Sequence, residues 1–341
     1  MKSFRKLHLK GNEMVNEDSF LKNILHKLGK ENMLQGNEDA IAVELETEKN
    51  ILVINTDSMS LSSDALPPEI SLFDFGKKLV TITVSDVITK GATPKYFLST
   101  ITVPKNFTDD QSNGLVAGML EGCNSYNLSY LGGDLGNSIE LVISGIVIGF
   151  CKKGSLLKRS NAKENDLVCT TGYFGLTGLG YKHYLEGSSI LNDHPEILQR
   201  VNKKLSNPRA VIEWVPHLLK YANATIDSSD GLYKSLYHLA QESNKSINLE
   251  ILPTDPFLVK NLKNYPKILN QCTLFGGEEF EIVFTISRQN LELLQNEVEQ
   301  GIFKDFLVIG TVKEGKKEVL YKMKPISDFG PVWNSFSGFI S

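Results

Sequence analysis

Acidic residues beside small or hydroxyl-bearing residues recur along the chain, and they are the strongest candidates for a functional site. One such group, Asn55-Thr56-Asp57, directly follows an apolar run. The others are Glu38-Asp39, Ser85-Asp86, Gly133-Asp134, Asp227-Ser228-Ser229-Asp230 and Gly277-Glu278-Glu279. Carboxylate and hydroxyl oxygens are hard ligands that suit Mg²⁺, which often shares phosphate oxygens. The pattern predicts phosphoryl transfer, a reaction that works by positioning and charge neutralisation and needs no nucleophilic side chain.

Each group also has a structural explanation. Asp57 could belong to a polar turn after a strand, and Asp230, just before Gly231, could cap a helix. If the groups converge, they repel one another, since a like-charged pair at about 4 Å costs roughly 4 kcal/mol at an effective dielectric constant of 20. A convergent cluster is therefore expected to need cations.

Other mechanisms lack their motifs. No segment fits the P-loop pattern, and no GxGxxG follows a predicted strand. The glycine-rich segment 172–180 has the composition of a phosphate loop without the spacing, so a tight strand-to-helix turn explains it equally well. The six histidines are scattered, and the four cysteines form no CxxC pair. The sequence offers no convincing nucleophile.

The elements that must position the acidic groups follow from hydrophobic periodicity and from turn residues. The apolar run 51–54 predicts a buried strand that presents Asp57 at its end. A helix that ends at Gly91 and a helix capped by Thr108 are also predicted. The first half is expected to contain helices over 18–28, 71–90 and 108–126, strands over 40–45, 50–56, 96–103, 129–131 and 140–150, and a loop over 58–68.

The polar, basic segment 152–164 predicts a domain boundary. We expect an N-terminal domain over residues 1–151 and a C-terminal α/β domain over 152–341. In the second half, strands are expected over 166–171, 224–226, 281–286 and 306–311, and helices after the glycine-rich loop and over 208–220, 230–243 and 289–299. Alternating strands and helices predict a two-domain protein of α+β or α/β class.

The overall composition is that of a soluble globular protein. The chain has 341 residues, a hydrophobic content of 41% and a formal net charge of −4, so no general attraction to nucleic acid or to an anionic membrane is implied. Its longest apolar run, near residues 141–150, is too short to span a bilayer. The N-terminus lacks the apolar core of a signal peptide. A cytoplasmic location is expected.

Taken together, the motifs resemble those of the thiamine-monophosphate kinases, in the superfamily of aminoimidazole ribonucleotide synthetase. The segments at 37–40, 55–57, 84–92, 132–134, 159–162, 226–232 and 276–281 resemble the family's GDDA, TTD, SDLAAMGA, GGD, RSGA, IDxSDGL and GGEDYEL motifs in the family's order. The resemblance implies metal ligands at Asp39, Asn55, Thr56, Asp57, Asp86, Asp134, Asp227 and Asp230. It implies ATP contacts at Gly133, Asp134, Arg159 and Ser229, and substrate contacts at Glu278 and Trp333.

The sequence departs from the family pattern at several positions. Gly36 is displaced by one residue from the first motif, and Asn161 replaces the glycine of RSGA. Asp64 stands where the bacterial enzymes have a substrate-binding histidine, in a context similar to the archaeal form. We expect Asp64 either to attract the cationic thiazolium ring of the substrate or to shape the turn before Pro67-Pro68.

The resemblance implies direct in-line transfer of a phosphoryl group from ATP to thiamine monophosphate. Several Mg²⁺ ions, with K⁺ as a further candidate, would assist, and the sheet of the N-terminal domain would pair with that of a second subunit in a homodimer. Two alternatives stay open. One is another ATP-dependent enzyme of the superfamily, and the other is a non-catalytic protein that binds nucleotide or metal.

Overall fold

The computed structural model describes most of the chain. The described residues are 32–34, 38–45, 49–300, 306–329, 332–334 and 338–340. The helix predicted over residues 18–28 lies outside them. In the described part, no helix combines the length and the apolar character that crossing a membrane requires.

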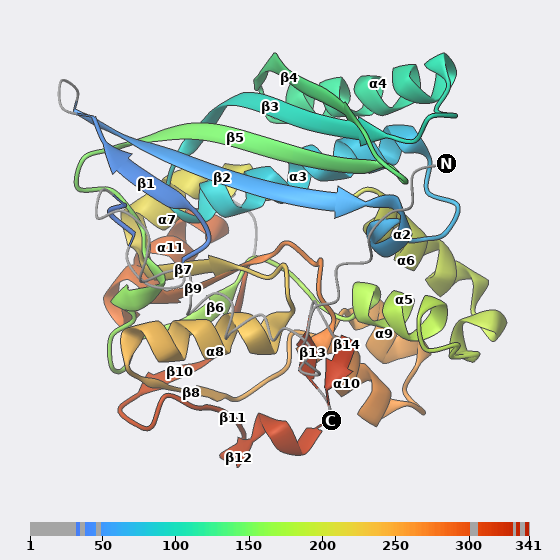
Figure 1. Cartoon of the computed structure of the whole chain (residues 1–341). Coiled ribbons are helices and arrows are strands. Elements are labelled where there is room, and N and C mark those ends of the chain that lie inside the picture. Colours follow the sequence, from blue (N-terminus) through green and yellow to red (C-terminus); the bar gives the residue numbers. More distant parts are fainter. Residues whose placement is uncertain are drawn as a thin grey trace, which may run out of the picture.

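The first sheet is built from residues 41–152. Its strands are β1 (Ile41–Glu44), β2 (Asn50–Ser60), β3 (Thr93–Val103), β4 (Ser129–Asn137) and β5 (Val142–Lys152), in the order β1-β2-β5-β3-β4. Only β3 and β4 are parallel, and the other neighbours are antiparallel. The long pairing of β2 with β5 runs from Asn50 opposite Lys152 to Ser60 opposite Val142. Figure 1 shows this sheet as the upper layer of the molecule.

Two helices, α3 (Leu72–Thr89) and α4 (Asp109–Ser125), cover one face of this sheet. The Ser71 side chain caps α3 by accepting a hydrogen bond from the Asp74 amide, and Thr108 caps α4 in a capping box with Gln111. Gly91, at φ 73°, follows the end of α3 in the left-handed conformation. The two helices, the Thr108 cap and the stop at Gly91 confirm the predictions made from the sequence, and the Ser71 cap was not predicted.

Glycine on β5 allows α3 to lie close to the sheet. A Cβ atom at Gly145 would come within 2.7 Å of Thr83 Oγ1 and within 2.9 Å of the Phe97 ring. Because real Cβ contacts are longer than this, any larger residue would push the helix outward. Gly145 is the partner of Asp57 in the ladder, so the close approach brings α3 next to that carboxylate.

A second sheet follows in the order β12-β11-β8-β10-β6-β9-β7. Its strands are β6 (Leu167–Thr170), β7 (Ala222–Asp227), β8 (Ser246–Leu249), β9 (Ile282–Ile286), β10 (Leu307–Lys313), β11 (Val319–Tyr321) and β12 (Lys324–Pro325). Only β8 and β11 are parallel. Since both large sheets are mainly antiparallel, the fold is α+β. A short hairpin, β13 (Val332–Asn334) and β14 (Gly338–Ile340), lies near the C-terminus.

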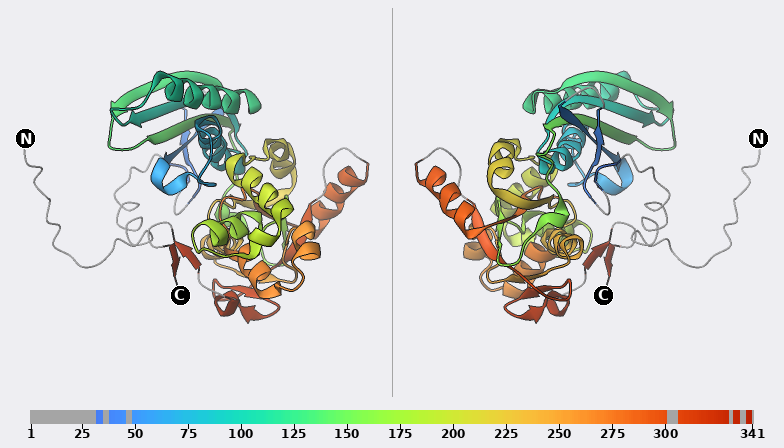
Figure 2. Two further views of the ribbon diagram at one scale, coloured as in Figure 1. Left: turned by 90° about the vertical axis from the view of Figure 1, so that its right-hand side faces the viewer. Right: turned by 90° about the vertical axis from the view of Figure 1, so that its left-hand side faces the viewer.

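Helices cover both faces of the second sheet. Helix α8 (Leu232–Ser243) packs on one face, while α7 (Val215–Tyr221) and α11 (Arg288–Glu299) pack on the other (Figures 1 and 2). Four further helices, α5 (Leu176–Tyr184), α6 (Pro195–Ser206), α9 (Pro256–Asn261) and α10 (Pro266–Phe275), surround a separate core cluster.

Several predicted boundaries were wrong. Strand β2 does not end at Asp57 but continues to Ser60, because β5 pairs with it along its whole length. The predicted loop over 58–68 therefore begins with strand and includes α2 (Leu61–Asp64). The helix predicted over 208–220 starts later, as a 3₁₀ turn over Ile212–Trp214 followed by α7. Among the described residues, α6, α9, α10, β8, β11, β12, β13 and β14 were not predicted.

Candidate active site

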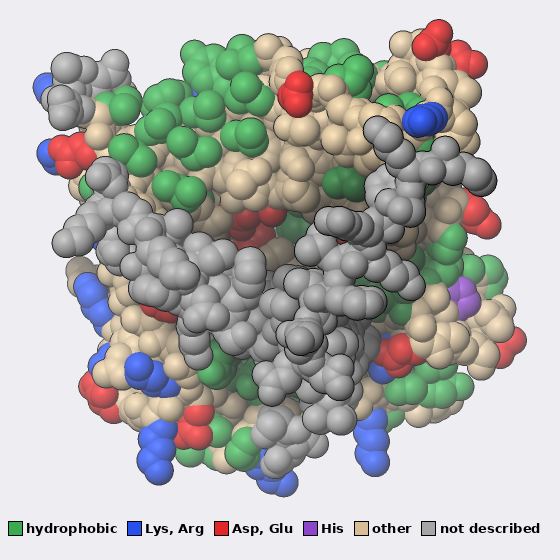
Figure 3. All heavy atoms as spheres, in the orientation of Figure 1, with side chains coloured by type: hydrophobic (Ala, Val, Ile, Leu, Met, Phe, Trp, Pro, Cys, Tyr) green, Lys and Arg blue, Asp and Glu red, His purple; other side chains and the backbone are tan. Residues whose placement is uncertain are grey.

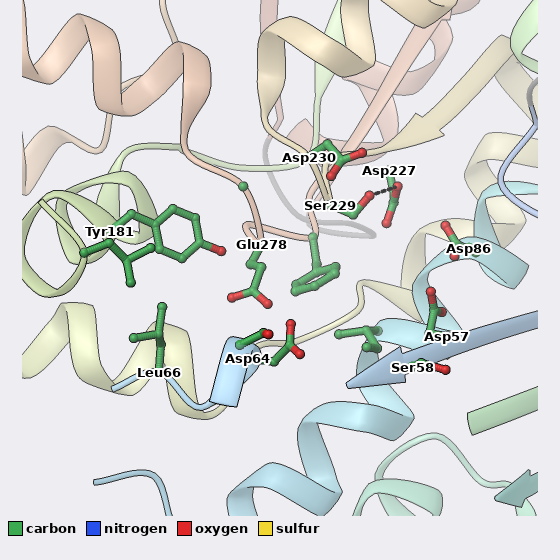
Figure 4. A pocket seen from close by; sticks show the side chains of 15 residues that line it. Asp57, Ser58, Asp64, Leu66, Asp86, Tyr181, Asp227, Ser229, Asp230 and Glu278 are labelled. Carbon is green, nitrogen blue, oxygen red and sulfur yellow. Dashed lines mark hydrogen bonds between the residues drawn. The ribbon is translucent and has the colours of Figure 1, made fainter. Parts of the chain in front are cut away.

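Carboxylates from three different elements meet where the two sheets face each other. Asp57 lies on β2, Asp86 on α3, and Asp227 at the end of β7 (Figure 4). One carboxylate oxygen from each of Asp39, Asp86 and Asp227 lies within 4.8 Å of the others. Asp230 borders the same cavity. The acidic groups that are far apart in the sequence therefore converge.

Hydrogen bonds hold these side chains in place. The Asn55 side-chain amide donates to Asp57 Oδ2 and to Asp86 Oδ2, both at 2.6 Å, and thereby links β2 to α3. Ser85 Oγ donates to Asp227 Oδ2 at 2.8 Å, which links α3 to β7. Helix α3 is thus the element that brings the two halves of the cluster together.

Burial and mutual repulsion change the acidity of the cluster. Desolvation, together with the charges of Asp227 and Asp57, raises the pKa of Asp86 well above its usual value. Desolvation and the charge of Asp39 raise the pKa of Asp227 to about 7. Desolvation, only partly offset by the bond from Asn55, raises the pKa of Asp57 to about 6. Closely spaced buried carboxylates of this kind fit hard divalent cations such as Mg²⁺.

Asp39 differs from the other carboxylates because cations contact it directly. Lys90 Nζ lies 2.6 Å from Asp39 Oδ2, and Arg159 Nη2 pairs with Asp39 Oδ1. Although burial alone would raise it, these two cations hold the pKa of Asp39 well below its usual range. Lys90 also pairs with Glu38 at 2.6 Å.

The cluster opens onto a cavity of about 420 Å³ that Asp64 and Glu278 line together with Asp57, Asp86 and Asp227. Figure 4 shows Glu278 and Asp64 on the side of the cavity nearer Tyr181, and the metal-ligand candidates on the other side. This volume is typical of small-molecule sites.

Glu278 belongs to a backbone turn that needs unusual conformations. Glu278 has φ 62° and Phe280 has φ 53°, both in the left-handed region that favours glycine. The Glu278 amide donates to Ser229 O at 2.6 Å, and Lys78 Nζ pairs with the Glu278 carboxylate at 2.8 Å. Backbone strain held at a cavity is typical of functional sites.

Some predicted site residues lie elsewhere. The Thr56 side chain cannot join the cluster, because Thr56 alternates with Asn55 and Asp57 and is exposed on the opposite face of β2. Gly133 and Asp134 lie on edge strand β4 and border a different cavity, of about 300 Å³. Trp333 lies on β13. Arg159 and Ser229 do reach the cluster: Ser229 Oγ donates to Asp227 Oδ1 at 3.2 Å.

The sequence analysis missed Lys78, Lys90 and Tyr181, each of which contacts or borders the site. Lys78 lies in α3 and Lys90 caps its C-terminal end, and both side chains are buried. Their position within a strongly apolar helix was the available signal, since lysine is rarely buried without an acidic partner.

Comparisons with known proteins agree with this geometry. Residues 37–151 match the family model described as AIR synthase related protein, N-terminal domain. The thiamine-monophosphate kinase of Pyrococcus horikoshii is 35% identical over 268 residues, which cover 78% of this chain and 79% of the relative.

Solved structures of proteins with related names are also similar to this chain. AaThiL complexed with AMPPCP and TMP superposes with a TM-score of 0.79 at 26% identity, over 92% of this chain and 97% of that one. Thiamine monophosphate kinase from Aquifex aeolicus gives 0.73 at 26% identity, over 90% and 96%. The identity to the Pyrococcus relative over most of both chains places this protein with the enzymes whose motifs it carries: the chain belongs to the thiamine-monophosphate kinase family.

Proposed function

We propose that this protein transfers the γ-phosphoryl group of ATP to thiamine monophosphate, forming thiamine diphosphate and ADP. The observation that carries the proposal is the cavity that joins a carboxylate cluster, Asp57, Asp86 and Asp227, to Glu278 and Asp64 at its other side. A related structure is described as a complex with AMPPCP and TMP, an ATP analogue beside the acceptor. Membership of the kinase family supports the same reaction.

We propose that Asp39, Asp57, Asp86, Asp227 and Asp230 hold Mg²⁺ ions. When bound, these ions supply positive charge that neutralises the phosphates and orients them. Asn55 orients Asp57 and Asp86 through its amide nitrogen, and its side-chain oxygen is a further proposed metal ligand. A requirement for K⁺ is a further proposal, tested by replacing K⁺ with Na⁺ in the assay.

The nucleotide is proposed to contact Arg159 and Ser229 at the carboxylate cluster. Gly133 and Asp134 on β4 are proposed to contact it at a second point, and Asp134 is also a proposed metal ligand. The guanidinium of Arg159 suits phosphate oxygens because it can donate two parallel hydrogen bonds. In the structure this group pairs with Asp39, so nucleotide binding would exchange one anionic partner for another.

The acceptor is proposed to bind at the Glu278 side of the cavity. Glu278 and Asp64 carry negative charge that attracts the permanently cationic thiazolium ring, and Trp333 is proposed to offer an aromatic face to it. Attack by the phosphate of the acceptor on the γ-phosphorus, with ADP as the leaving group, needs no nucleophilic side chain. The protein's task is to align both phosphates for in-line transfer.

We also propose two domains, residues 1–151 and 152–341, and a homodimer formed by the outer face of the first sheet. That face carries Leu52, Ile54, Ile146 and Ile148, none of them fully buried in the single chain. Hydrophobic side chains gather over these strands in the upper part of Figure 3. The reduced cysteines and the use of ATP support a cytoplasmic location.

Incubation of the protein with Mg·ATP and thiamine monophosphate tests the proposed reaction. Thiamine diphosphate and ADP are expected in equal amounts, separated and identified by chromatography. Thiamine, which lacks the acceptor phosphate, should give no product. ADP without thiamine diphosphate would indicate a different acceptor. Binding of ATP without any turnover would favour a non-catalytic protein.

A further inference from the structure

We propose that the Lys90 ammonium is a built-in cation of the carboxylate cluster, which partly neutralises Asp39 and so weakens the contribution of Asp39 to metal binding. The inference rests on the proposed Mg·ATP site and concerns how much metal that site requires. Its consequence is that Mg²⁺ acts mainly at Asp57, Asp86 and Asp227, and that metal affinity is weaker than the acidic residues alone would give.

Lys90 is completely enclosed. Its side chain is 0% exposed, and its Nζ lies 2.6 Å from both Glu38 Oε2 and Asp39 Oδ2. The two carboxylate side chains are only 3% and 0% exposed. A buried lysine between two buried carboxylates is a fixed charge, because neither side can rearrange into water without opening the fold.

The position of Lys90 follows from the end of α3. Lys90 is the C-terminal cap of this helix, one turn beyond Asp86, and Gly91 then reverses the chain. The neighbouring Thr89 Oγ1 also donates to Asp39 Oδ2, at 3.1 Å. The same helix therefore delivers a carboxylate to one side of the cluster and an ammonium to the other.

Both oxygens of Asp39 face cationic groups of the protein itself, Lys90 on Oδ2 and Arg159 on Oδ1. Asp39 nevertheless lies within the group whose carboxylate oxygens are mutually within 4.8 Å. A divalent ion that bound Asp39 would have to displace the ammonium or lie beside it against charge repulsion. Asp57, by contrast, accepts its hydrogen bond from the neutral side chain of Asn55.

Replacement of Lys90 by methionine separates this role from ordinary packing, because methionine keeps the unbranched shape and loses the charge. Thermal melting of wild type and Lys90→Met is measured over a Mg²⁺ titration, with Mg²⁺ alone and with Mg·ATP. Without metal, the variant should melt at a lower temperature. Its Mg²⁺-induced rise in Tm should be larger, with a half-effect at a Mg²⁺ concentration about tenfold lower, since the uncovered carboxylates attract the ion.

Two further variants complete the test. Lys153→Met removes a lysine that pairs with Glu44 at the surface, and should leave the Mg²⁺ response unchanged. Lys90→Met/Glu38→Gln removes one charge of each sign, so it should fold if the single variant does not. In it the Asp39 carboxylate still lacks the ammonium, so a lower half-effect concentration than wild type is again expected.

The outcomes are distinct. If Lys90→Met and the double variant lose stability but respond to Mg²⁺ as wild type does, Lys90 is only a packing element and the inference is overturned. If wild type itself gains no stability from Mg·ATP, the proposed metal and nucleotide site fails, and the inference fails with it. If wild type is stabilised by Mg·ATP and both variants respond to Mg²⁺ as wild type does, the inference about Lys90 is wrong while the proposed metal and nucleotide site stands.

Discussion

At the scale of single residues, the cluster is a set of charges that the fold holds together at a cost. The pKa of Asp227 is raised to about 7, mainly by desolvation. At 1.36 kcal/mol per pKa unit, this corresponds to roughly 4 kcal/mol of unfavourable free energy for the charged form. The proposed Mg²⁺ ions would offset this cost when bound.

Asp57→Asn and Asp86→Asn are expected to abolish turnover while leaving the protein folded. Each substitution keeps the side-chain shape and removes a charge that would hold a metal ion. The loss should appear in kcat, because metal neutralises charge that develops in the transition state. A drop of at least about 100-fold, 2.7 kcal/mol, is expected for each. Near-wild-type turnover of both variants in steady-state assays would contradict the metal assignment.

Asp64 has contacts that fit both of its proposed roles. Its Oδ2 accepts a hydrogen bond from the Ser60 amide at 2.7 Å, which shapes the exit from β2. It also lines the cavity together with Glu278, and desolvation raises its pKa. A turn-shaping residue and a substrate-attracting charge are therefore compatible in one side chain.

Asp64→Asn separates these roles, because asparagine can still accept the Ser60 hydrogen bond. Loss of the charge should raise KM for thiamine monophosphate about fivefold and leave kcat and the KM for ATP largely unchanged, since the contact exists before and during transfer. Glu69→Gln, an exposed change on the same segment, is the matched control. An unchanged KM for thiamine monophosphate would leave Asp64 with the turn alone.

At the scale of elements, the turn 277–280 depends on a buried carboxylate next to Glu278. Glu279 Oε1 accepts hydrogen bonds from the Gly175 and Thr177 amides, at 2.8 and 3.2 Å, and from Thr177 Oγ1. Its other oxygen lies 3.4 Å from Lys204 Nζ. The start of α5 thus holds the Glu279 carboxylate in place. Glu279 thereby stabilises the turn, in which Glu278 and Phe280 have the unfavourable left-handed conformation.

Glu279→Gln should therefore weaken substrate binding without removing any substrate contact. The variant places an amide NH₂ near Lys204, so the turn loosens and KM for thiamine monophosphate should rise about tenfold. The protein should also lose about 3 kcal/mol of unfolding free energy, measured by urea denaturation. Glu281→Gln is the control. Glu281 also pairs with Lys204, but it accepts a hydrogen bond from Thr171 and not from the start of α5. An equal rise in KM in Glu281→Gln would argue against a specific role for Glu279.

Elements whose ends are marked by neighbouring residues in the sequence could be predicted, whereas elements that depend on pairing with distant strands could not. Helix α3 was predicted within one residue because Ser71 and Gly91 mark its ends. The end of β2 was missed because its last residues form strand only through pairing with β5. Helix α6 was missed although Ile197, Val201 and Leu205 repeat at four-residue spacing, so here the local signal was present.

The sequence indicated which residues belong to the site, but not how their side chains are arranged in space. Acidic residues beside small residues marked Asp57, Asp86 and Asp227 in the sequence. The exclusion of Thr56 required strand alternation, and the location of Asp134 at another cavity required the sheet order. The apolar sequence around Lys90 indicates a buried lysine, but only the fold shows which carboxylates surround it.

At the scale of the whole molecule, the two halves share one interior. Tyr126 follows α4 in the first half, and its OH lies 3.1 Å from Thr81 Oγ1 on α3 and accepts a hydrogen bond from the Ala210 amide of the second half. Thr225 Oγ1 on β7 donates to Thr89 O at 2.5 Å. One hydrophobic cluster contains both Phe97 and Phe284. The carboxylate cluster therefore lies at a junction where the two halves are packed and hydrogen-bonded together, which suits a reaction that depends on alignment.

The opposite face of the first sheet is apolar and is not covered by the two helices. On this face Ile54 pairs with Ile148 and Leu52 with Phe150, and neither α3 nor α4 covers it. Ile41 on edge strand β1 is 47% exposed. A contiguous apolar surface is typical of protein interfaces, which supports the proposed pairing with a second copy of the same sheet.

Ile148→Lys tests the homodimer at the centre of this face. Burying an unpaired ammonium in a dimer interface costs several kcal/mol, so the dimer dissociation constant should rise at least about 100-fold. Light scattering coupled to size-exclusion chromatography should give a dimer for wild type and a monomer for the variant. Leu293→Lys, on the exposed side of α11, should remain dimeric because it adds the same charge away from the sheet. A monomeric wild type, or a variant that stays dimeric at low micromolar concentration, would refute pairing through this face and direct attention to another surface.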